Sequence, residues 1–405
     1  MGPDRAEMSH HPRPIAVCAL LVAGTVLGLS GIDLVLPAIP DLPDLLGGDE
    51  ARAQLVIAAY TGGTALGLLL YGALGAKFGR RNCLIGGLGL FAVISFLAAL
   101  APTIESLIGL RFVQGVSSAA PAVFAPGIIK ALFDERGATK AIGALASIES
   151  LAPALAPVAG IGLLALGGWT LSFSLTGVLA AALTAALIAF RDLLPPTAKT
   201  ASAGSYVRLL ISPVYMRYAV SHACVVGGLL VFVFGAPAVI VNTMDGTITD
   251  FILMQVVGIS TFIVASNTAG RVVDRFGAEW AIWFGTSMAG LGSVVLLTAA
   301  LTVPELDPVW LVPLFVPVNM GLGFRGPPGF LRTMQASGGD DDRAASLTIL
   351  GILVIAAGGT ALLAPVINQG LPVLAAAACF ILVAAMASLA LLPRLAPIPG
   401  AVEQT

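Results

Sequence analysis

Long apolar runs follow one another along almost the whole chain, and short segments with charges, prolines and glycines separate them. A helix needs about 20 apolar residues to cross a bilayer. Twelve segments are about this long or longer: 15–38, 52–75, 83–101, 104–130, 139–166, 169–190, 214–241, 249–271, 279–302, 309–331, 344–368 and 371–393. The pattern predicts an all-α polytopic membrane protein with twelve transmembrane helices in the lipid bilayer.

The longest polar segment between these runs divides them six and six. It covers residues 191–213 and contains PPTAKTASAGS, a sequence typical of a linker. We therefore expect an N-terminal six-helix half at 15–190 and a C-terminal half at 214–393, with polar tails at 1–14 and 394–405. The first apolar run has no small-residue cleavage site, so we expect this helix to be retained.

Lysine and arginine collect in every second loop. With the N-terminus inside, all but three of the 20 Lys and Arg fall on the inner side. The exceptions are Arg52 in an outer loop, and Arg111 and Arg325 within spans. The positive-inside rule therefore predicts cytoplasmic N- and C-termini.

Composition narrows the possible functions. The chain is 58% hydrophobic and 10% charged, with a net charge of −2, so little remains for a soluble domain and no basic patch suggests a nucleic-acid partner. Its four cysteines lie far apart, which predicts neither a disulfide nor a metal site. There is no H-E-x-x-H motif and no phosphate loop. We expect a protein that is not an enzyme, uses no cofactor and, if it transports actively, draws on an ion gradient.

The turn after the second span recurs after the eighth. The first turn holds Gly72, Ala76, Lys77, Phe78 and Gly79, and the second, at the same spacing, holds Gly270, Asp274, Arg275, Phe276 and Gly277. The chain therefore has the pattern of a duplicated six-helix unit. In such repeats a substrate site is expected near the midplane, between the halves.

Three charged residues within apolar runs are candidates for proton coupling, because charge inside a bilayer is costly without a function. Asp33 lies about five residues before the outer end of its span; the alternative is an acid that reaches water. Arg111 lies at a similar depth and would hold nearby acids ionised, or else anchor the helix at the interface. Glu149 lies near mid-bilayer, where a carboxyl group suits proton uptake and release; the alternative is a protonated structural glutamate.

Four further polar residues in the spans are candidates for lining the substrate cavity: Gln114, His222, Asn319 and Arg325. Gln114 lies one helical turn after Arg111 on the same face. Arg325 lies about four residues before an inner helix end. Its side chain is expected either to reach the inner surface or to line the cavity, and the two alternatives are equally open. A packed histidine is the favoured interpretation of His222.

Several segments together resemble a known family. They are the repeated G-x-x-x-[D]-[KR]-x-G turn, DLVLPAIP, RFVQGVSSAAPAV, LAPALAPVAG and FVFGAPAVIV. The chain is similar over nearly its whole length to the major facilitator superfamily, and within it to the drug:proton antiporters of the Bcr/CflA type. This resemblance implies two pseudo-symmetric halves and multidrug efflux by alternating access, with small organic molecules and protons as partners. It also implies a monomer in the bacterial inner membrane.

The resemblance assigns further residues. Asp33 matches a functional acid, and Pro153, Pro157 and Gly160 match a helix-bending motif, although Ala159 replaces one expected glycine. A conformational latch that closes the cytoplasmic side of the outward-facing form would comprise Gly72, Lys77, Gly79, Arg80, Arg81, Asp274 and Arg275.

Ala76 replaces the acid of the first latch turn. The neighbouring cations are then expected to pair with Asp134 and Glu135 of the next inner loop. Ala76→Asp is expected to shift the resting population toward the outward-facing form.

The sequence favours a proton-coupled exporter of small apolar or amphipathic molecules. An importer or facilitator of a metabolite is the alternative within transport, because the same fold runs in either direction. A receptor or scaffold that transports nothing is the alternative from another class.

Overall fold

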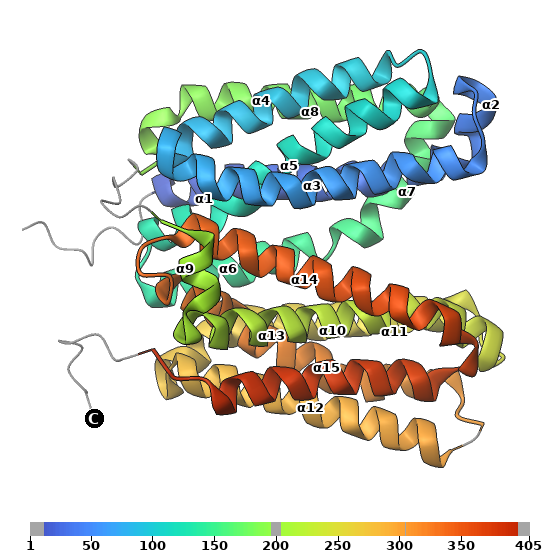
Figure 1. Ribbon diagram of the computed structural model, residues 1–405, viewed down its shortest axis with the longest axis vertical. Helices are drawn as coiled ribbons and strands as arrows, with labels where there is room; N and C mark the ends of the chain where they lie inside the picture. The colour runs from blue at the N-terminus through green and yellow to red at the C-terminus, as the bar shows by residue number, and fades with distance from the viewer. Residues whose placement is uncertain (1–11, 196–203, 304, 396–405) are drawn as a thin grey trace, which may run out of the picture.

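The computed structural model describes residues 12–195, 204–303 and 305–395, and in this part of the chain all regular secondary structure is helical. Two bundles lie one above the other in Figure 1. The N-terminal bundle contains α1 (Pro12–Asp33), η2 (Leu36–Asp41), α2 (Leu42–Leu46), α3 (Glu50–Phe78), α4 (Arg80–Ala99), α5 (Ile104–Leu132), α6 (Glu135–Glu149), α7 (Ala152–Gly167), α8 (Trp169–Ala189) and η3 (Arg191–Leu193).

A short helix, α9 (Tyr206–Ile211), precedes the C-terminal bundle. That bundle contains α10 (Pro213–Thr243), α11 (Ile248–Phe276), α12 (Ala278–Thr302), η4 (Pro308–Trp310), α13 (Leu311–Gln335), α14 (Asp341–Leu363), η5 (Ala364–Gln369) and α15 (Leu371–Leu391). Within the described residues, 11 helices are long and apolar enough to cross a membrane. The predicted all-helical membrane fold is confirmed, with 11 long helices among these residues in place of the twelve predicted spans.

The fifth predicted span, 139–166, is not one helix. It is divided into α6 and α7 at Ser150 and Leu151. Pro153 has no N–H to donate to the carbonyl of Glu149 four residues earlier, and its ring crowds that carbonyl. The prediction that Glu149 lies inside a continuous helix is therefore wrong, because Glu149 is the last residue of α6.

The first span also differs from the prediction. The α-helix ends at Asp33, and the chain continues through the 3-10 helix η2. The last α-helical bond runs from Leu34 to the carbonyl of Ser30 at 3.0 Å, and Val35 already donates to Ile32 three residues earlier. Pro37 has no N–H with which to resume the α-helical ladder. Asp33 thus terminates α1 instead of lying a turn inside it.

Glycines permit the closest helix packing within each half. A side chain added at Gly63 on α3 would overlap the backbone of Phe112 on α5, and one at Gly115 would overlap the backbone of Tyr60. In the other half, Gly285 on α12 packs against the backbone of α13 in the same way. Without Cβ atoms at these positions, the backbones approach closely and gain dispersion contacts over a long seam.

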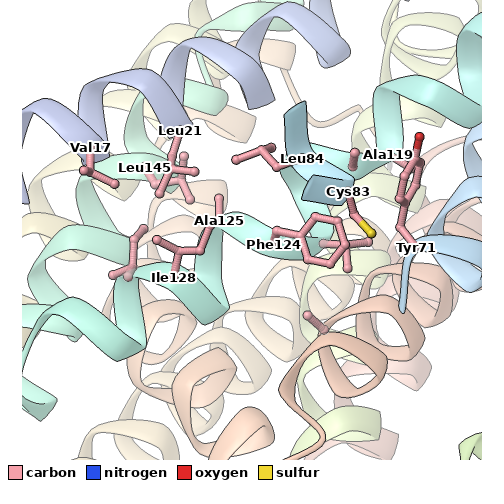
Figure 2. Close-up of a cluster of buried hydrophobic side chains, with 14 of the residues drawn as sticks. Val17, Leu21, Tyr71, Cys83, Leu84, Ala119, Phe124, Ala125, Ile128 and Leu145 are labelled. Carbon is pink, nitrogen blue, oxygen red and sulfur yellow. The ribbon is translucent and has the colours of Figure 1, made fainter. Parts of the chain in front are cut away.

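The two halves meet at the end of the bundle that carries the turns at Gly79 and Gly277, called the basic end below. A cluster of buried apolar side chains joins them there, with Leu84 and Phe124 on one side and Phe330 on the other. Figure 2 shows part of this cluster, including Leu84 and Phe124.

Polar contacts between the halves also lie toward the basic end. Ser266 on α11 donates to the carbonyl of Gly143 on α6 at 3.2 Å, and Asn267 donates to the Ser147 hydroxyl at 2.9 Å. Among the described residues, every hydrogen bond and ion pair between the halves lies within about four turns of the basic end. In Figure 1, α7 and α14 diverge away from that end. The structure is therefore closed at the basic end.

Candidate functional site

Arg111 lies fully buried about two turns into α5. Its Nη1 atom donates to the carbonyl of Gly31 on α1 at 2.9 Å and to Oε1 of Gln114 at 2.8 Å. The Tyr60 ring covers the guanidinium, with 4.2 Å between Cζ and the ring centroid. Hydrogen bonds and an aromatic face both stabilise a buried cation. Arg111 is thus held against the last turn of α1.

The polar contacts continue away from Arg111 into the N-terminal half. The Gln114 side chain donates to the Ser95 hydroxyl on α4 at 2.7 Å, and Ser95 donates to the carbonyl of Phe91 at 2.6 Å. The Tyr60 hydroxyl donates to the carbonyl of Gly28 at 2.6 Å. These bonds tie α1, α3, α4 and α5 together. Gln114 therefore packs within its own half.

Glu149 lies at the break between α6 and α7. Helix α6 packs beside α1, and Thr25 of α1, whose hydroxyl donates to the carbonyl of Val22, lies near this carboxyl group. In the described part of the chain, no Lys, Arg or His nitrogen lies within 4.0 Å of this carboxyl group. Glu149 is therefore an acid at a helix break without a cationic partner.

Asp33 lies on the same helix as Thr25, eight residues further on, and is half-buried. At 1.5 Å per residue, the level of Asp33 is about 12 Å from that of Glu149 along α1. Gly160 on α7 packs against the backbone of Leu34, where a side chain would overlap it. Structure thus places Asp33, Arg111 and Glu149 around the last three turns of α1.

No direct ion pair joins these three residues. Among the described residues, no carboxylate oxygen lies within 4.0 Å of the Arg111 guanidinium, whose Nε and Nη2 atoms have no hydrogen-bond partner. A role of Arg111 in keeping Asp33 or Glu149 ionised would therefore act over a longer distance in this state. That role stays a prediction.

The helix-bending motif has three separate structural roles. Pro153 lies in the first turn of α7 and accounts for the break after Glu149, whereas Pro157 lies inside α7. Gly160 makes the close contact with the end of α1. The motif therefore joins the break at Glu149 to the region of Asp33.

In the C-terminal half, the predicted cavity residues are packed side chains. His222 on α10 and Arg325 on α13 come together at Gly329, and the His222 ring lies on Phe330 with 5.2 Å between centroids. Asn319 faces Gly258 on α11 instead. Gln114, His222, Asn319 and Arg325 are each no more than 6% exposed. Their role as substrate ligands stays a prediction.

Arg325 does not lie near a helix end. Helix α13 continues to Gln335, ten residues beyond it, so the prediction of about four residues is wrong. The side chain is fully buried, and Nη1 donates to the carbonyl of Ser221 at 2.9 Å. Full burial excludes the alternative in which Arg325 reaches the inner surface in this state.

At the second latch turn, Asp274 makes a contact with the other half. Its carboxylate forms an ion pair with Arg136 on α6, with 2.9 Å between Oδ2 and Nε. Arg275 lies over the ring of Phe276, as Lys77 lies over that of Phe78. The glycines that end the two turns, Gly79 and Gly277, both have φ of 85°, which favours glycine.

The first latch turn is paired differently from the prediction. Arg80 pairs across the halves with Asp342 at 2.6 Å and Asp341 at 3.4 Å, while Arg81 donates to the carbonyl of Leu194 at 2.9 Å. The expected partners are occupied elsewhere: Asp134 accepts from the backbone of Gly137, and Glu135 pairs with Arg332. The expected pairing with Asp134 and Glu135 is therefore wrong.

Gly72 has a packing role at the same place. A side chain there would overlap the Tyr206 hydroxyl and the Ser346 side chain. Tyr206 on α9 donates to the carbonyl of Leu69 on α3 and lies beside Arg343 on α14. Burial raises the pKa of the Tyr206 phenol to about 12, so the group stays a neutral donor near neutral pH.

Sequence reasoning missed several partners of these residues. Tyr60, Ser95 and Thr25 are ordinary residues of apolar helices, and nothing in the sequence distinguishes them. The acids Asp341 and Asp342 did carry a signal, because they belong to a run of three consecutive aspartates on the side where Lys and Arg predominate.

The geometry defines a helical membrane protein of two bundles that carry the same turn motif. Residues 21–345, well over half of the chain, match the family model of the Major Facilitator Superfamily. The chain belongs to the major facilitator superfamily.

Curated relatives include drug-resistance proteins. A chloramphenicol resistance protein from Pseudomonas aeruginosa is 27% identical over 327 residues, 78% of this chain and 77% of the relative. A bicyclomycin resistance protein homolog from Haemophilus influenzae is 26% identical over 67% of this chain and 70% of its own. The multidrug resistance protein MdtL of Klebsiella pneumoniae is 30% identical, over 37% of this chain and 38% of its own.

Solved structures agree on the fold. The transporter FucP in its outward conformation has a TM-score of 0.69 at 17% identity, over 93% of this chain and 99% of its own. The proton:xylose symporter XylE has a TM-score of 0.71 at 14% identity, over 94% of this chain and 96% of its own. The fold agrees with the family match, which shows that the chain is a multi-pass membrane transporter and not an enzyme.

Proposed function

We propose that the chain is a proton-coupled exporter of small apolar or amphipathic organic molecules that works as a monomer in a bacterial plasma membrane. The observation that carries this proposal is Glu149, an acid without a cationic partner at a helix break beside α1. A broken helix frees backbone polar groups in the membrane, and in transporters such breaks accompany binding sites for ions and substrates.

In this proposal the basic end is cytoplasmic, as the loop charges predict, so the structure corresponds to an outward-facing state. A proton from outside would neutralise Asp33 or Glu149. A neutral acid is less costly to enclose in an apolar environment than a carboxylate, so protonation would favour closure of the outer side. Arg111 would act as a fixed positive charge against the end of α1.

The named relatives support the substrate class. The relatives carry the names of resistance proteins for chloramphenicol, for bicyclomycin or for several drugs, and both named drugs are small organic molecules. The low exposure of the polar candidates in the C-terminal half agrees with an apolar substrate, because few charged groups are left to bind a charged one.

The experiment is a drug-susceptibility panel in cells that lack their own exporters. Expression of the wild-type chain is expected to raise the tolerated concentration of at least one small apolar drug about fourfold or more, with chloramphenicol and bicyclomycin among the compounds. Glu149→Gln should remove this protection at equal membrane levels, whereas Asp44→Asn, an exposed acid on α2, should preserve it.

Two other results would contradict the proposal. Increased sensitivity to a compound would indicate import. Unchanged tolerance across the panel, together with no thermal stabilisation by any compound, would favour a receptor or scaffold that transports nothing.

A further inference from the structure

The repeat places two equivalent corners at the basic end. At one corner, the end of α11 meets the start of α6, and Asp274 pairs with Arg136, the second residue of α6. At the other corner, the end of α3 meets the start of α14. The equivalents there are Ala76 and Asp342, the second residue of α14. Ala76 thus stands at the position equivalent to the acid Asp274. Asp342 stands at the position equivalent to the cation Arg136.

The corner at Ala76 contains a cavity, and the backbone of α3 comes close to Asp342 there. A cavity of about 290 Å³ lies at this corner, and its lining includes Gly75, Ala76, Gly127, Lys130 and Asp342. A Cβ atom on Gly75 would lie 2.7 Å from Oδ2 of Asp342. The end of α3 thus approaches the carboxylates closely and presents only small, uncharged residues to them.

Cations of the N-terminal half reach the same carboxylates from the side. Arg80 Nε lies 2.6 Å from Oδ1 of Asp342, and Lys130 Nζ lies 2.8 Å from Oδ1 of Asp341. Both acids lie in the first turn of α14, where the helix dipole stabilises negative charge.

The two corners differ in exposure. The side chains of Asp341 and Asp342 are 11% and 9% exposed, against 33% for Asp274 and 66% for Arg136. Less exposed pairs are screened less by water and salt. The corner that lacks the motif acid therefore has the stronger electrostatic contact.

We propose that this corner is an inverted latch, in which Asp341 and Asp342 of the C-terminal half bind Arg80 and Lys130 of the N-terminal half to hold the basic end closed. Ala76 is the matching change on α3, because an acid there would face Asp342. The latch residues are separate from Asp33, Arg111 and Glu149, so this inference goes beyond the proposed transport activity. It also reverses the expectation from sequence that Ala76→Asp strengthens closure.

The test measures the distance between the halves without any substrate. Spin labels are placed at the exposed residues Asn82 on α4 and Trp280 on α12, after the four native cysteines are replaced by alanine. Pulsed electron paramagnetic resonance then gives the populations that are closed and open at the basic end. The variants are Ala76→Asp, its uncharged match Ala76→Asn, Asp342→Arg, and the double variant Ala76→Asp with Asp342→Arg.

Ala76→Asp is expected to raise the ratio of open to closed molecules about tenfold, whereas Ala76→Asn changes it less than about twofold. Asp342→Arg also opens the basic end, because arginine would face Arg80 and Lys130. The double variant recovers more closed population than either charged single variant, since the pair then has the arrangement of Asp274 and Arg136.

A closed population that Ala76→Asp leaves unchanged or increases would overturn the inverted latch. So would a double variant as open as the two single variants. Size-exclusion elution and the unfolding temperature of each labelled variant show whether it is folded. If Asp342→Arg does not fold, the ratio of open to closed molecules in Ala76→Asp is compared with that in Ala76→Asn, and this comparison alone decides the proposal.

Discussion

At the residue scale, Arg111 combines a buried charge with an incomplete set of partners. Two of its nitrogens have no hydrogen-bond partner, and each such buried group costs about 1–3 kcal/mol. Arg325 in the C-terminal half leaves its Nε and Nη2 atoms without partners as well, so each half buries one guanidinium at this cost. The geometry of Arg111 fits a charge that gains further partners in another state of the transport cycle.

Arg111→Met removes the charge and keeps a similar length. Because Arg111 has no anionic partner within 4.0 Å among the described residues, its removal leaves no buried charge uncompensated, and we expect the unfolding temperature in detergent to stay within a few degrees of wild type. Proton-driven transport should fall more than tenfold. Arg111→Lys, which keeps the charge, should retain more transport than Arg111→Met. A large loss of stability with normal transport per folded molecule would show that Arg111 is structural.

At the scale of helices, the seam between α3 and α5 depends on glycine. Gly63→Ala is expected to destabilise the protein by about 1–3 kcal/mol, because the added methyl group overlaps the backbone of Phe112. The adjacent Gly62 has open space around it, so Gly62→Ala is a matched control with little effect. Thermal unfolding of the two variants checks this, and equal unfolding temperatures would contradict the packing.

The break between α6 and α7 gives a second prediction. Pro153→Ala restores an N–H that can donate to the carbonyl of Glu149, so the two helices are expected to join. Hydrogen–deuterium exchange at the amides of residues 150–152 should slow, and transport should fall. Pro157→Ala, a change inside α7, should leave exchange at the break unchanged. Equal exchange in Pro153→Ala and wild type would show that the proline does not cause the break.

The existence of the helices could be predicted because hydrophobic length is a strong signal, but their interruptions could not. Pro121 and Pro126 lie inside α5 without ending it, whereas Pro153 separates two helices. Neighbouring helices decide which prolines are tolerated, and that information is tertiary. For the same reason, Arg111 could be found as a charge in an apolar run, whereas Tyr60 and the pairing of Arg80 with Asp342 could not.

At the scale of the whole molecule, the two corners of the basic end should contribute unequally to closure. Exposed ion pairs contribute about 0–1 kcal/mol each, so Asp274→Asn should open the basic end less than about fivefold. Asp342→Asn removes a pair that is far less exposed and should open it more. The distance measurement between α4 and α12 compares the two variants directly, and a larger effect of Asp274→Asn would contradict the order of strength.

The central claim is that a proton gradient drives export through the acids beside α1. The most direct measurement is uptake into inside-out vesicles of the compound to which expression gives the greatest resistance, with an imposed acidic interior. Wild type should accumulate it only while the gradient lasts, and Glu149→Gln and Asp33→Asn should not, although both reach the membrane folded. Accumulation without a gradient, or full gradient-driven accumulation in both variants, would contradict the account.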